Sequence, residues 1–473
     1  MRNKLNTMKN KQPAKHHTTR RGFIKTAAAG AAGAFVFPTI VPSSVFGAGA
    51  PGNRINIGAI GCGRISREHD MPGAWNDPNV RIIAVCDVDS KRLDDAKKLV
   101  SGHFTKKLGK PFTDVRAYGN YQELLANKDI DAVLISTPDH QHASQAIDSV
   151  RAGKDVYLQK PTSLTVTEGR AMSNAVNSTG RIFQIGSQQR SMPQFRVACE
   201  LVRNGRIGRL KTIEIRLPGD PPGGNPAEMP VPPNLNYDAW LGPTPWAPYT
   251  LDRVHPQHDY GRPGWLRCEQ FGAGMITGWG THHFDIAHWA MGTEHTGPVE
   301  ISAKAEFPAP GSGLWDVHGD FQSEMLYANG VKVFGMVATK EKPNGVLFTG
   351  EDGWIFVSRG RYAASASDPA SAGSTRALQA SDPALLAWKP GAGDIQLTQS
   401  ADHHLNWLEA VRSRKQPITN AEVAHRSCSA CLLQHIAMKL PRKLYWDPVR
   451  ERFKNDDEAN AMLSRPQRPP YGI

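Results

Sequence analysis

The chain has 473 residues, of which 40% are hydrophobic, and a formal net charge of +12. This length exceeds what one compact core accommodates, so it predicts two domains. Eight Lys and Arg residues and no acidic residue fall in residues 1–50, which leaves only +4 on the rest of the chain. Charge confined to one terminal segment argues against a nucleic-acid partner.

Residues 1–50 are typical of an export signal. Residues 19–25 read Thr-Arg-Arg-Gly-Phe-Ile-Lys, a twin-arginine pattern, and an apolar run rich in Ala and Gly follows at residues 27–36. This run is shorter than the roughly 20 residues of a membrane-spanning helix. We therefore expect a twin-arginine signal peptide at residues 1–50 and export of the folded protein to the periplasm or an equivalent location. No integral membrane span is expected once the signal is removed.

Strand-like apolar runs alternate with helical patterns after the signal. The expected strands are residues 55–60, 81–86, 132–136, 155–158 and 182–185, and the expected helices are residues 90–100, 121–126, 142–152 and 166–178. Such alternation predicts an α/β fold with a doubly wound parallel sheet. In that fold, ligands bind at the carboxyl ends of the strands.

A glycine-rich turn follows the first expected strand. Gly61 permits a tight turn, and Gly63 lets the backbone approach a pyrophosphate at a helix N-terminus. Ser66 stands where the full fingerprint has a third glycine, so this motif alone is weak. Asp87 supports it, because it ends the second strand 26 residues after Gly61, where an acid accepts hydrogen bonds from a ribose diol. Its carboxylate would repel a 2′-phosphate, which favours NAD over NADP.

Two further loops follow expected strands and open onto the same crevice. One contains Thr137-Pro138-Asp139-His140 and the other contains Lys160-Pro161. A lysine in a loop is usually a solvated charge. In a parallel sheet, however, Lys160 would lie beside the nicotinamide end of a bound dinucleotide.

This ordered set of motifs resembles the Gfo/Idh/MocA oxidoreductase family, named for glucose–fructose oxidoreductase and inositol dehydrogenase. The matching stretches are Gly61–Ile65, Asp87, residues 137–140, Lys160-Pro161, and Gly272–Ile276 leading to His282 and Asp285. The resemblance covers most of residues 53–445. It implies an N-terminal Rossmann domain at residues 51–184, a C-terminal α/β domain with a largely antiparallel open sheet at residues 185–445, and a tail at residues 446–473. Because this open sheet often mediates assembly in the family, a homo-oligomer is expected.

The resemblance also implies roles for individual residues. Lys160 is expected to contact nicotinamide and the substrate hydroxyl, and His282 to accept the proton. Apart from the resemblance, the place of Arg190 after the strand at residues 182–185 makes it an expected substrate or nicotinamide contact, and Asp285, three residues after His282 on one helix face, is an expected substrate contact. The expected cofactor-binding residues are Gly61, Gly63, Arg64, Ile65, Asp87, Thr137, Pro138, His140 and Lys160. Two positions depart from the family pattern, because Gln159 replaces a glutamate before Lys160 and Gly278 stands where an acid often precedes His282 by four residues.

The second half of the chain changes pattern. Strands are expected at residues 210–217, 299–307, 322–327, 331–337 and 354–357, and helices at residues 403–413, 421–440 and 457–463. Residues 218–248 are dense in Pro, Gly, Asn and Trp and predict a long loop near the crevice, while residues 364–381 predict a surface excursion. Cys428 and Cys431 have CxxC spacing within a helical pattern, which favours a buried helix face over a redox or metal site. The histidines around His282 do not require a metal, and none is expected.

Three hypotheses for the function remain open. The first is an exported NAD-dependent oxidoreductase that acts on a hydroxyl of a carbohydrate, whether a sugar, a glycoside or a polyol. Its cofactor must be tightly bound, because the exported location has no ready NAD pool. The second is an NAD-dependent, redox-neutral glycosidase that works by oxidation, elimination and re-reduction. The third is a non-catalytic sugar-binding relative.

Overall fold

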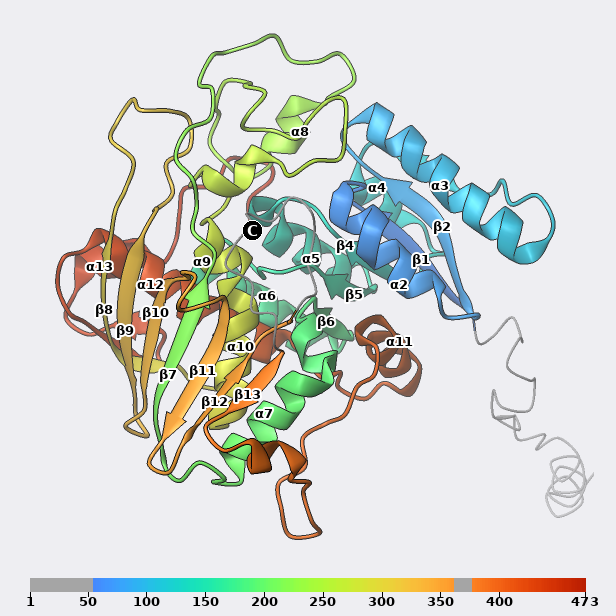
Figure 1. Cartoon of the computed structure of the whole chain (residues 1–473). Coiled ribbons are helices and arrows are strands. Elements are labelled where there is room, and N and C mark those ends of the chain that lie inside the picture. Colours follow the sequence, from blue (N-terminus) through green and yellow to red (C-terminus); the bar gives the residue numbers. More distant parts are fainter. Residues whose placement is uncertain (1–53, 361–376) are drawn as a thin grey trace, which may run out of the picture. The chain divides into compact units, whose positions relative to one another are not determined.

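The computed structural model describes residues 54–360 and 377–473, so the twin-arginine segment lies outside the described residues. The first half of this part of the chain forms a six-stranded, all-parallel sheet in the order β3-β2-β1-β4-β5-β6 (Figure 1). Its strands are β1 (Ile55–Ile60), β2 (Val80–Cys86), β3 (Arg116–Tyr118), β4 (Ala132–Ile135), β5 (Asp155–Leu158) and β6 (Phe183–Ile185). The doubly wound sheet predicted from the sequence is therefore confirmed.

Helices cover this sheet, and side-chain caps stabilise the first turns of some of them. They are α2 (Met71–Trp75), α3 (Ser90–Leu108), α4 (Tyr121–Ala126), α5 (His142–Arg151) and α6 (Val166–Thr179), whereas the next helix, α7 (Pro193–Arg203), packs on the second half of the chain. Asp89 caps α3 by accepting from the backbone N–H of Lys91 and Arg92. Thr165 and Glu168 form a capping box at the start of α6. Helix α3 runs eight residues beyond the predicted end at residue 100, because Phe104 continues its buried face.

The second half forms a nine-stranded sheet in the order β13-β12-β11-β7-β10-β9-β8-β14-β15. Only the pairing of β7 with β10 is parallel, so the predicted, largely antiparallel sheet is confirmed. The strands are β7 (Leu210–Leu217), β8 (Pro298–Ala305), β9 (Phe321–Tyr327), β10 (Lys332–Val337), β11 (Gly345–Gly350), β12 (Trp354–Val357), β13 (Leu378–Ala380), β14 (Leu444–Asp447) and β15 (Arg452–Phe453). Strands β3, β11, β13, β14 and β15 were not predicted from the sequence.

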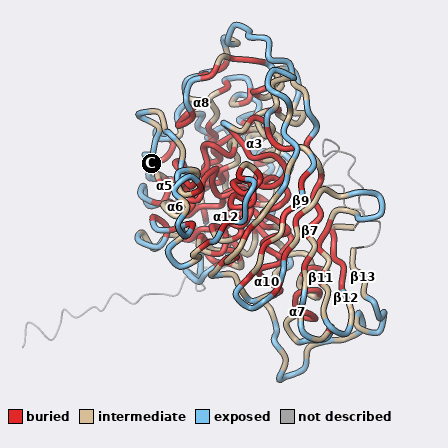
Figure 2. Tube along the Cα trace, turned by 90° about the vertical axis from the view of Figure 1, so that its left-hand side faces the viewer, coloured by how far each residue is buried: buried red, intermediate tan, exposed pale blue. Residues whose placement is uncertain are grey.

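Helices pack against this second sheet, with α7 and α10 behind β7, β11 and β12 in Figure 1. The helices of this half are α8 (Tyr237–Leu241), α9 (Met275–Gly278), α10 (Gly280–Met291), α11 (His403–Ser413), α12 (Ala421–Lys439) and α13 (Asp457–Ala461). Helix α12 contacts α6, α10 and β8, and Figure 2 shows its trace as buried. Cys428 and Cys431 on α12 are buried and free, as the prediction of a buried helix face requires. Among the described residues, no helix is long and apolar enough to cross a membrane.

Helix α11 joins the core of the parallel sheet although it follows the second sheet in sequence. Trp407 and Leu408 are fully buried in one cluster with Met71 of α2 and with β1 and β2 side chains. The end of α11 also reaches the sheet, where Arg414 forms an ion pair with Asp155. The start of α11 therefore lies at the crevice between the two sheets. The domain boundaries at residues 184 and 445 stay predictions.

Residues 218–274 form an ordered excursion with a small core of its own. Its buried side chains are Leu235, Tyr237, Trp240, Leu241, Ala247, Tyr249, Val254, Cys268 and Phe271. This core explains why the Trp- and Tyr-rich stretch is ordered, because its aromatic rings pack against one another. The excursion contacts the parallel-sheet half at the N-terminus of α3, where the Ser90 N–H donates to the Asn234 carbonyl at 2.9 Å.

Candidate active site

The turn after β1 is shaped to cradle a phosphate group. Gly61 has φ +81°, and a Cβ there would lie 2.8 Å from the backbone of both Ser136 and Thr137, so only glycine fits. A Cβ on Gly63 would meet nothing closer than the Arg92 guanidinium at 4.0 Å, so this side of the turn stays open. A helical stretch then begins at Arg64. An open glycine at a helix N-terminus fits the pyrophosphate of a dinucleotide.

Asp87 lies where the sequence predicts a ribose contact. Its carboxylate accepts from the Cys62 N–H at 2.7 Å and from the Asp89 N–H at 2.9 Å, which fixes it beside the glycine turn. Burial raises the pKa of Asp87, and the nearby His255 opposes that shift. An acceptor held at the end of β2 suits the diol of NAD and disfavours the extra phosphate of NADP.

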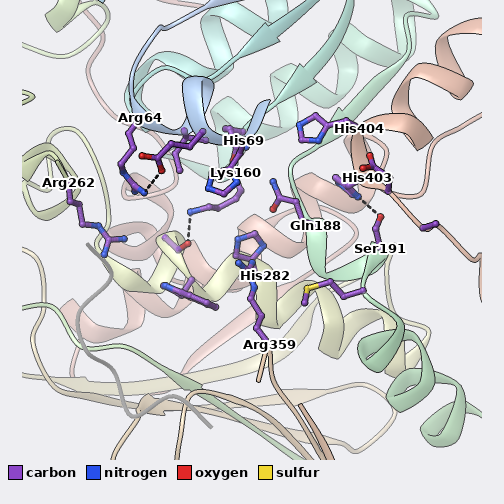
Figure 3. A pocket seen from close by; sticks show the side chains of 18 residues that line it. Arg64, His69, Lys160, Gln188, Ser191, Arg262, His282, Arg359, His403 and His404 are labelled. Carbon is purple, nitrogen blue, oxygen red and sulfur yellow. Dashed lines mark hydrogen bonds and ion pairs between the residues drawn. The ribbon is translucent and has the colours of Figure 1, made fainter. Parts of the chain in front are cut away.

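A cavity of about 420 Å³ opens beside this turn. Figure 3 shows the side chains that point into it. Its lining residues are Arg64, Ile65, Glu68, His69, Gln159, Lys160, Gln188, Ser191, Met192, Arg262, Gly278, Trp279, His282, Arg359, Ala401, Asp402, His403 and His404. Four predicted site residues, Arg64, Ile65, Lys160 and His282, therefore come together although they are up to 218 positions apart in sequence.

Lys160 stands at the end of β5 and reaches across to the second half of the chain. Its Nζ donates to the Gly278 carbonyl at 2.7 Å. Position 278, which carries no acid, thus still provides an oxygen that orients the ammonium group. The preceding residue, Gln159, points its amide at a buried carboxylate instead, with Nε2 donating to Asp70 at 2.7 Å.

Asp70 is a buried acid that the sequence analysis missed. It is 0% exposed and also accepts from the Ser136 hydroxyl at 2.6 Å, and His404 Nε2 lies 3.2 Å from it. These contacts bring β4, β5 and α11 together at one carboxylate. A buried carboxylate thus lies beside Gln159, although position 159 itself carries no acid.

His282, the predicted proton acceptor, lies in the wall of this cavity. It lies in the first turn of α10 and is 4% exposed, and its Nδ1 has no hydrogen-bond partner among the described residues. Burial, with the positive charges of Arg359 and Lys160, holds the pKa of His282 well below its ordinary value. The imidazole is therefore neutral at physiological pH, which a general base requires.

The neighbouring histidines have structural partners. His283 lies 2.9 Å from the Asn344 side-chain oxygen through Nε2 and 3.3 Å from Gln189 through Nδ1. His288 contacts the Tyr327 hydroxyl at 2.7 Å. Within residues 54–360 and 377–473, no group of three or more His, Cys, Asp or Glu side chains could hold a metal ion.

Arg190 and Asp285, predicted as substrate contacts, lie outside the cavity lining and form a buried ion pair. The guanidinium donates to both Asp285 oxygens at 2.7 and 2.8 Å, and a third nitrogen contacts Glu294 at 2.6 Å. The two residues are 2% and 1% exposed. Asp285 also accepts from the Ser427 hydroxyl, so its hydrogen bonds hold α10 to Arg190 and α12. Their substrate role stays a prediction that this geometry does not support.

None of the predicted cofactor-binding side chains in the loop after β4 lines the cavity. Thr137 packs against Gly61, and Pro138 begins a short helical turn at Asp139. His140, predicted as a cofactor contact, is 2% exposed and does not line the cavity. Its Nε2 lies 2.8 Å from the Trp240 carbonyl, and burial lowers its pKa to about 3. It therefore attaches the excursion to this loop as a neutral imidazole.

Asp139 is a second buried acid near the lysine. It is 3% exposed, and its Oδ2 has no hydrogen-bond partner among the described residues. Burial raises its pKa to about 7, against the opposing charges of Lys160 and Arg262. Asp139 is thus a much weaker acid than an exposed aspartate.

Sequence reasoning also missed Trp279, Arg262 and Arg359 as cavity residues. Arg262 lies in the excursion, and Arg359 follows β12, so neither belongs to a motif or to a periodic pattern. Trp279 lies just before α10, and the Arg359 guanidinium stacks over its ring at 4.7 Å. The one signal in the sequence that could have indicated a cavity residue was the position of Trp279 shortly before His282.

These features combine a parallel sheet that carries a glycine turn with a second, largely antiparallel sheet, and a lysine from the first half and a histidine from the second line one cavity. Comparison with known proteins agrees. The description "Oxidoreductase family, NAD-binding Rossmann fold" fits residues 55–187, and "Oxidoreductase family, C-terminal alpha/beta domain" fits residues 224–361 and 394–473. The chain belongs to the Gfo/Idh/MocA oxidoreductase family, and its N-terminal domain is that family's NAD-binding Rossmann fold.

Individual relatives match over part of their length. A glycosyl hydrolase family 109 protein of Shewanella pealeana is 30% identical over 204 residues, which are 40% of this chain and 44% of that protein. An inositol 2-dehydrogenase of Rhizobium meliloti is 30% identical over 170 residues, 36% of this chain and 47% of that protein. The chain thus spans about half the length of the curated relatives it matches.

A solved structure shares the fold over a longer range. The WlbA dehydrogenase of Bordetella pertussis, in complex with NADH and UDP-GlcNAcA, has a TM-score of 0.58 and 17% sequence identity, and the match covers 83% of this chain and 99% of that one. At this identity the likeness supports the fold of both domains. The residues of this chain must therefore carry the argument about its substrate.

Proposed function

We propose that this protein is an exported oxidoreductase that transfers hydride between NAD and a hydroxyl-bearing carbon of a sugar, glycoside or polyol. One observation carries the proposal: Lys160 from the Rossmann domain and His282 from the second domain line one cavity, together with Arg64 and Ile65 of the glycine turn. Bound NAD supplies the hydride acceptor. Export rests on the twin-arginine pattern of residues 19–25.

The two side chains divide the work on the substrate hydroxyl. The ammonium of Lys160, oriented by the Gly278 carbonyl, polarises the substrate oxygen and stabilises negative charge that develops there. Neutral His282 takes the hydroxyl proton. Because the positive charge of Lys160 itself helps keep His282 neutral, the pair is prepared for proton transfer before substrate binds.

Tight cofactor retention is supported by a covering segment, residues 232–263 of the excursion. Arg92 Nη2 of α3 donates to the Pro256 and Asp259 carbonyls at 2.8 and 3.0 Å. His255 Nε2 lies 2.8 Å from the Asp89 carboxylate, next to Asp87. These contacts place the covering segment at the ribose end of the cradle.

An aromatic contact adds to this cover. The Tyr260 ring stacks with two guanidinium groups, those of Arg67 at 4.4 Å and Arg92 at 4.5 Å. The ribose side of the glycine turn is therefore covered by residues from two parts of the chain. A protein exported after folding needs such retention, because no free NAD awaits it outside.

The test uses protein purified without added nucleotide. Denaturation should release NAD or NADH, and addition of a substrate sugar to the intact protein should produce absorbance of the reduced nicotinamide. A protein that contains no nucleotide and fails to bind NAD would refute the proposal and favour a non-catalytic, sugar-binding role. Static light scattering tests the expected homo-oligomer in the same samples.

A redox-neutral glycosidase is the second candidate. The similarity to a glycosyl hydrolase family 109 protein favours it, and so does a cofactor that cannot exchange, because such a reaction returns the hydride within one turnover. An aryl glycoside distinguishes the two candidates. Release of the aryl alcohol without net cofactor reduction supports the glycosidase, whereas stoichiometric reduction without release supports the dehydrogenase.

A further inference from the structure

Ser191 and His403 form a hydrogen-bonded pair in the wall of the cavity. Ser191 ends the short helical turn Gln188–Ser191 after β6, and His403 begins α11, 212 positions later in the chain. The Ser191 hydroxyl oxygen lies 2.9 Å from His403 Nδ1, and Figure 3 shows this contact as a dashed line. Asp402 caps α11 by accepting from the Leu405 N–H at 2.9 Å, which fixes the helix start that carries His403.

The tautomer of His403 follows from its second contact. His403 is 4% exposed, and its Nε2 lies 2.8 Å from the Ile185 carbonyl. A carbonyl can only accept, so Nε2 carries the ring proton. Burial lowers the pKa of His403 to about 4, against the opposing hydrogen bond to Ile185, so the imidazole is neutral at neutral pH and Nδ1 holds a lone pair. Ser191 therefore donates its one hydroxyl proton to His403.

This contact makes the Ser191 oxygen an acceptor toward the cavity. A hydroxyl oxygen has two lone pairs that can accept hydrogen bonds. Ser400 Oγ lies 2.8 Å from Ser191 Oγ and 3.1 Å from the Asp402 carbonyl, to which its hydroxyl can also donate. Ser400 thus occupies at most one of the two lone pairs of Ser191. The other can accept a hydrogen bond from a molecule bound in the cavity.

The next histidine, His404, is held differently. It also lines the cavity, but its Nε2 lies 3.2 Å from the buried carboxylate of Asp70. Its Nδ1 lies against Gly73, where an added Cβ would be only 2.2 Å away. Both ring nitrogens of His404 therefore face the protein. His403, in contrast, is linked to a hydroxyl that borders the cavity.

We propose that Ser191 binds a second hydroxyl group of the substrate, distinct from the reacting one, by accepting a hydrogen bond from it. Ser191 is then a specificity-determining residue, and His403 is a positioning residue that holds the Ser191 proton away from the substrate. This inference rests on the proposed oxidoreductase function and adds a requirement to its substrate class. The substrate carries a donating hydroxyl besides the one on which Lys160 and His282 act, and all three sites border one cavity.

The first experiment uses protein that retains its nucleotide. The probe is whichever of glucose, galactose and mannose reduces the bound cofactor fastest, together with its monodeoxy and monodeoxyfluoro derivatives. Fluorine cannot donate a hydrogen bond, so a site that only accepts treats it like the missing hydroxyl. At one ring position, both derivatives should raise KM about tenfold relative to the parent sugar. Fluoro derivatives that match the parent sugar in KM at every position other than the reacting one would overturn the inference.

Ser191→Ala removes the acceptor. Its KM for the parent sugar should rise about tenfold and its kcat should stay within about twofold, because a hydrogen bond made equally in the ground state and the transition state contributes to binding alone. The preference for the parent sugar over its derivatives should disappear, and Ser191→Thr, which keeps the hydroxyl, should restore part of it. Ser178→Ala is the control, since the Ser178 hydroxyl donates to the Ala175 carbonyl within α6 and does not line the cavity.

Two substitutions of His403 separate positioning from packing. Asparagine places an acceptor near the position of Nδ1, whereas glutamine places its amide near the position of Nε2. His403→Asn should therefore keep the preference for the parent sugar over the fluoro derivative, and His403→Gln should lose it. The Ile185 carbonyl stays paired in both variants, because the Thr419 hydroxyl also donates to it at 3.1 Å. Equal effects of the two substitutions would refute the positioning role.

The outcomes distinguish this inference from the proposed function. If sugars reduce the cofactor and Ser191→Ala leaves every KM unchanged, the oxidoreductase stands and the role of Ser191 is wrong. If Ser191→Ala loses its bound nucleotide, the donor is the nicotinamide amide and the inference is also wrong. If none of the sugars reduces the cofactor, calorimetric titration of the holoprotein with the same sugars decides. Binding that weakens about tenfold in Ser191→Ala supports the inference, and absent or unchanged binding refutes it.

Discussion

Replacement of Lys160 by methionine removes the ammonium group and keeps a side chain of similar length. In the structure the Nζ hydrogen bond to the Gly278 carbonyl is lost, and His282 loses one of the charges that lower its pKa. The Gly278 oxygen borders the cavity and can be hydrated, so the cost in folding stability should be about 1 kcal/mol. The loss should therefore fall on the reaction.

The size of that loss follows from the role assigned to Lys160. A group that polarises the reacting hydroxyl and supports its deprotonation contributes about 10²- to 10⁴-fold to the rate. We expect the single-turnover reduction of bound NAD to slow about 10³-fold, which corresponds to about 4 kcal/mol. Nucleotide content should remain at the level of the unmodified protein, because the glycine turn and Asp87 are unchanged.

The assay is stopped-flow absorbance of the bound cofactor, with nucleotide content measured after denaturation. Lys154→Met is the matched control at the opposite end of β5. Lys154 Nζ donates to the Asn127 and Ile130 carbonyls, both at 2.8 Å, so its removal should cost about 2–3 kcal/mol of stability and leave the rate unchanged. A Lys160→Met rate within tenfold of the unmodified protein would show that the role assigned to Lys160 is wrong.

Three further predictions concern the surrounding structure. Tyr260→Ala should accelerate release of NAD about tenfold, measured by nucleotide retained after gel filtration; unchanged retention would mean that the covering segment does not hold the cofactor. Arg190→Gln should cost about 3–5 kcal/mol in urea unfolding, because Asp285 is left buried without its charge partner, and a cost below 1 kcal/mol would contradict this. Burial opposes ionisation of Glu451, but its hydrogen bonds, above all the one from Arg170, lower its pKa to about 2. The stability that ionised Glu451 contributes is therefore present above pH 4.5 and is lost as the pH falls toward 2. In Glu451→Gln the urea midpoint should accordingly change less with pH over that range, and an unaltered dependence of the midpoint on pH would refute the prediction.

The Rossmann domain was predictable because its determinants are local. The apolar runs of β4 and β5 are buried on both faces, and a run of that kind is recognisable without knowledge of its partners. Gly61 was recognisable for the same reason, since a tight turn leaves a glycine in the sequence. Strand β11 was missed because its residues 345–350 contain glycine at both ends and lack a clear alternation.

The site was predictable only where a motif marks it. Lys160 and His282 belong to motifs and were found, whereas Asp70 was missed because its contacts join it to residues far away in the sequence, such as His404. Arg359 follows a short strand in a stretch with no motif. Conversely, Arg190 follows β6, as a ligand contact would, yet it forms a buried ion pair with Asp285. Position after a strand does not tell whether a charge faces the crevice or the interior.

The central claim is that this chain keeps its NAD and reduces it with a sugar bound between Lys160 and His282. The most direct measurement is absorbance of the reduced nicotinamide when sugars are added to protein purified without nucleotide. The account predicts reduction that approaches one cofactor per chain and is lost in Lys160→Met. Protein that carries no nucleotide, and that no sugar reduces after NAD is supplied, would contradict it.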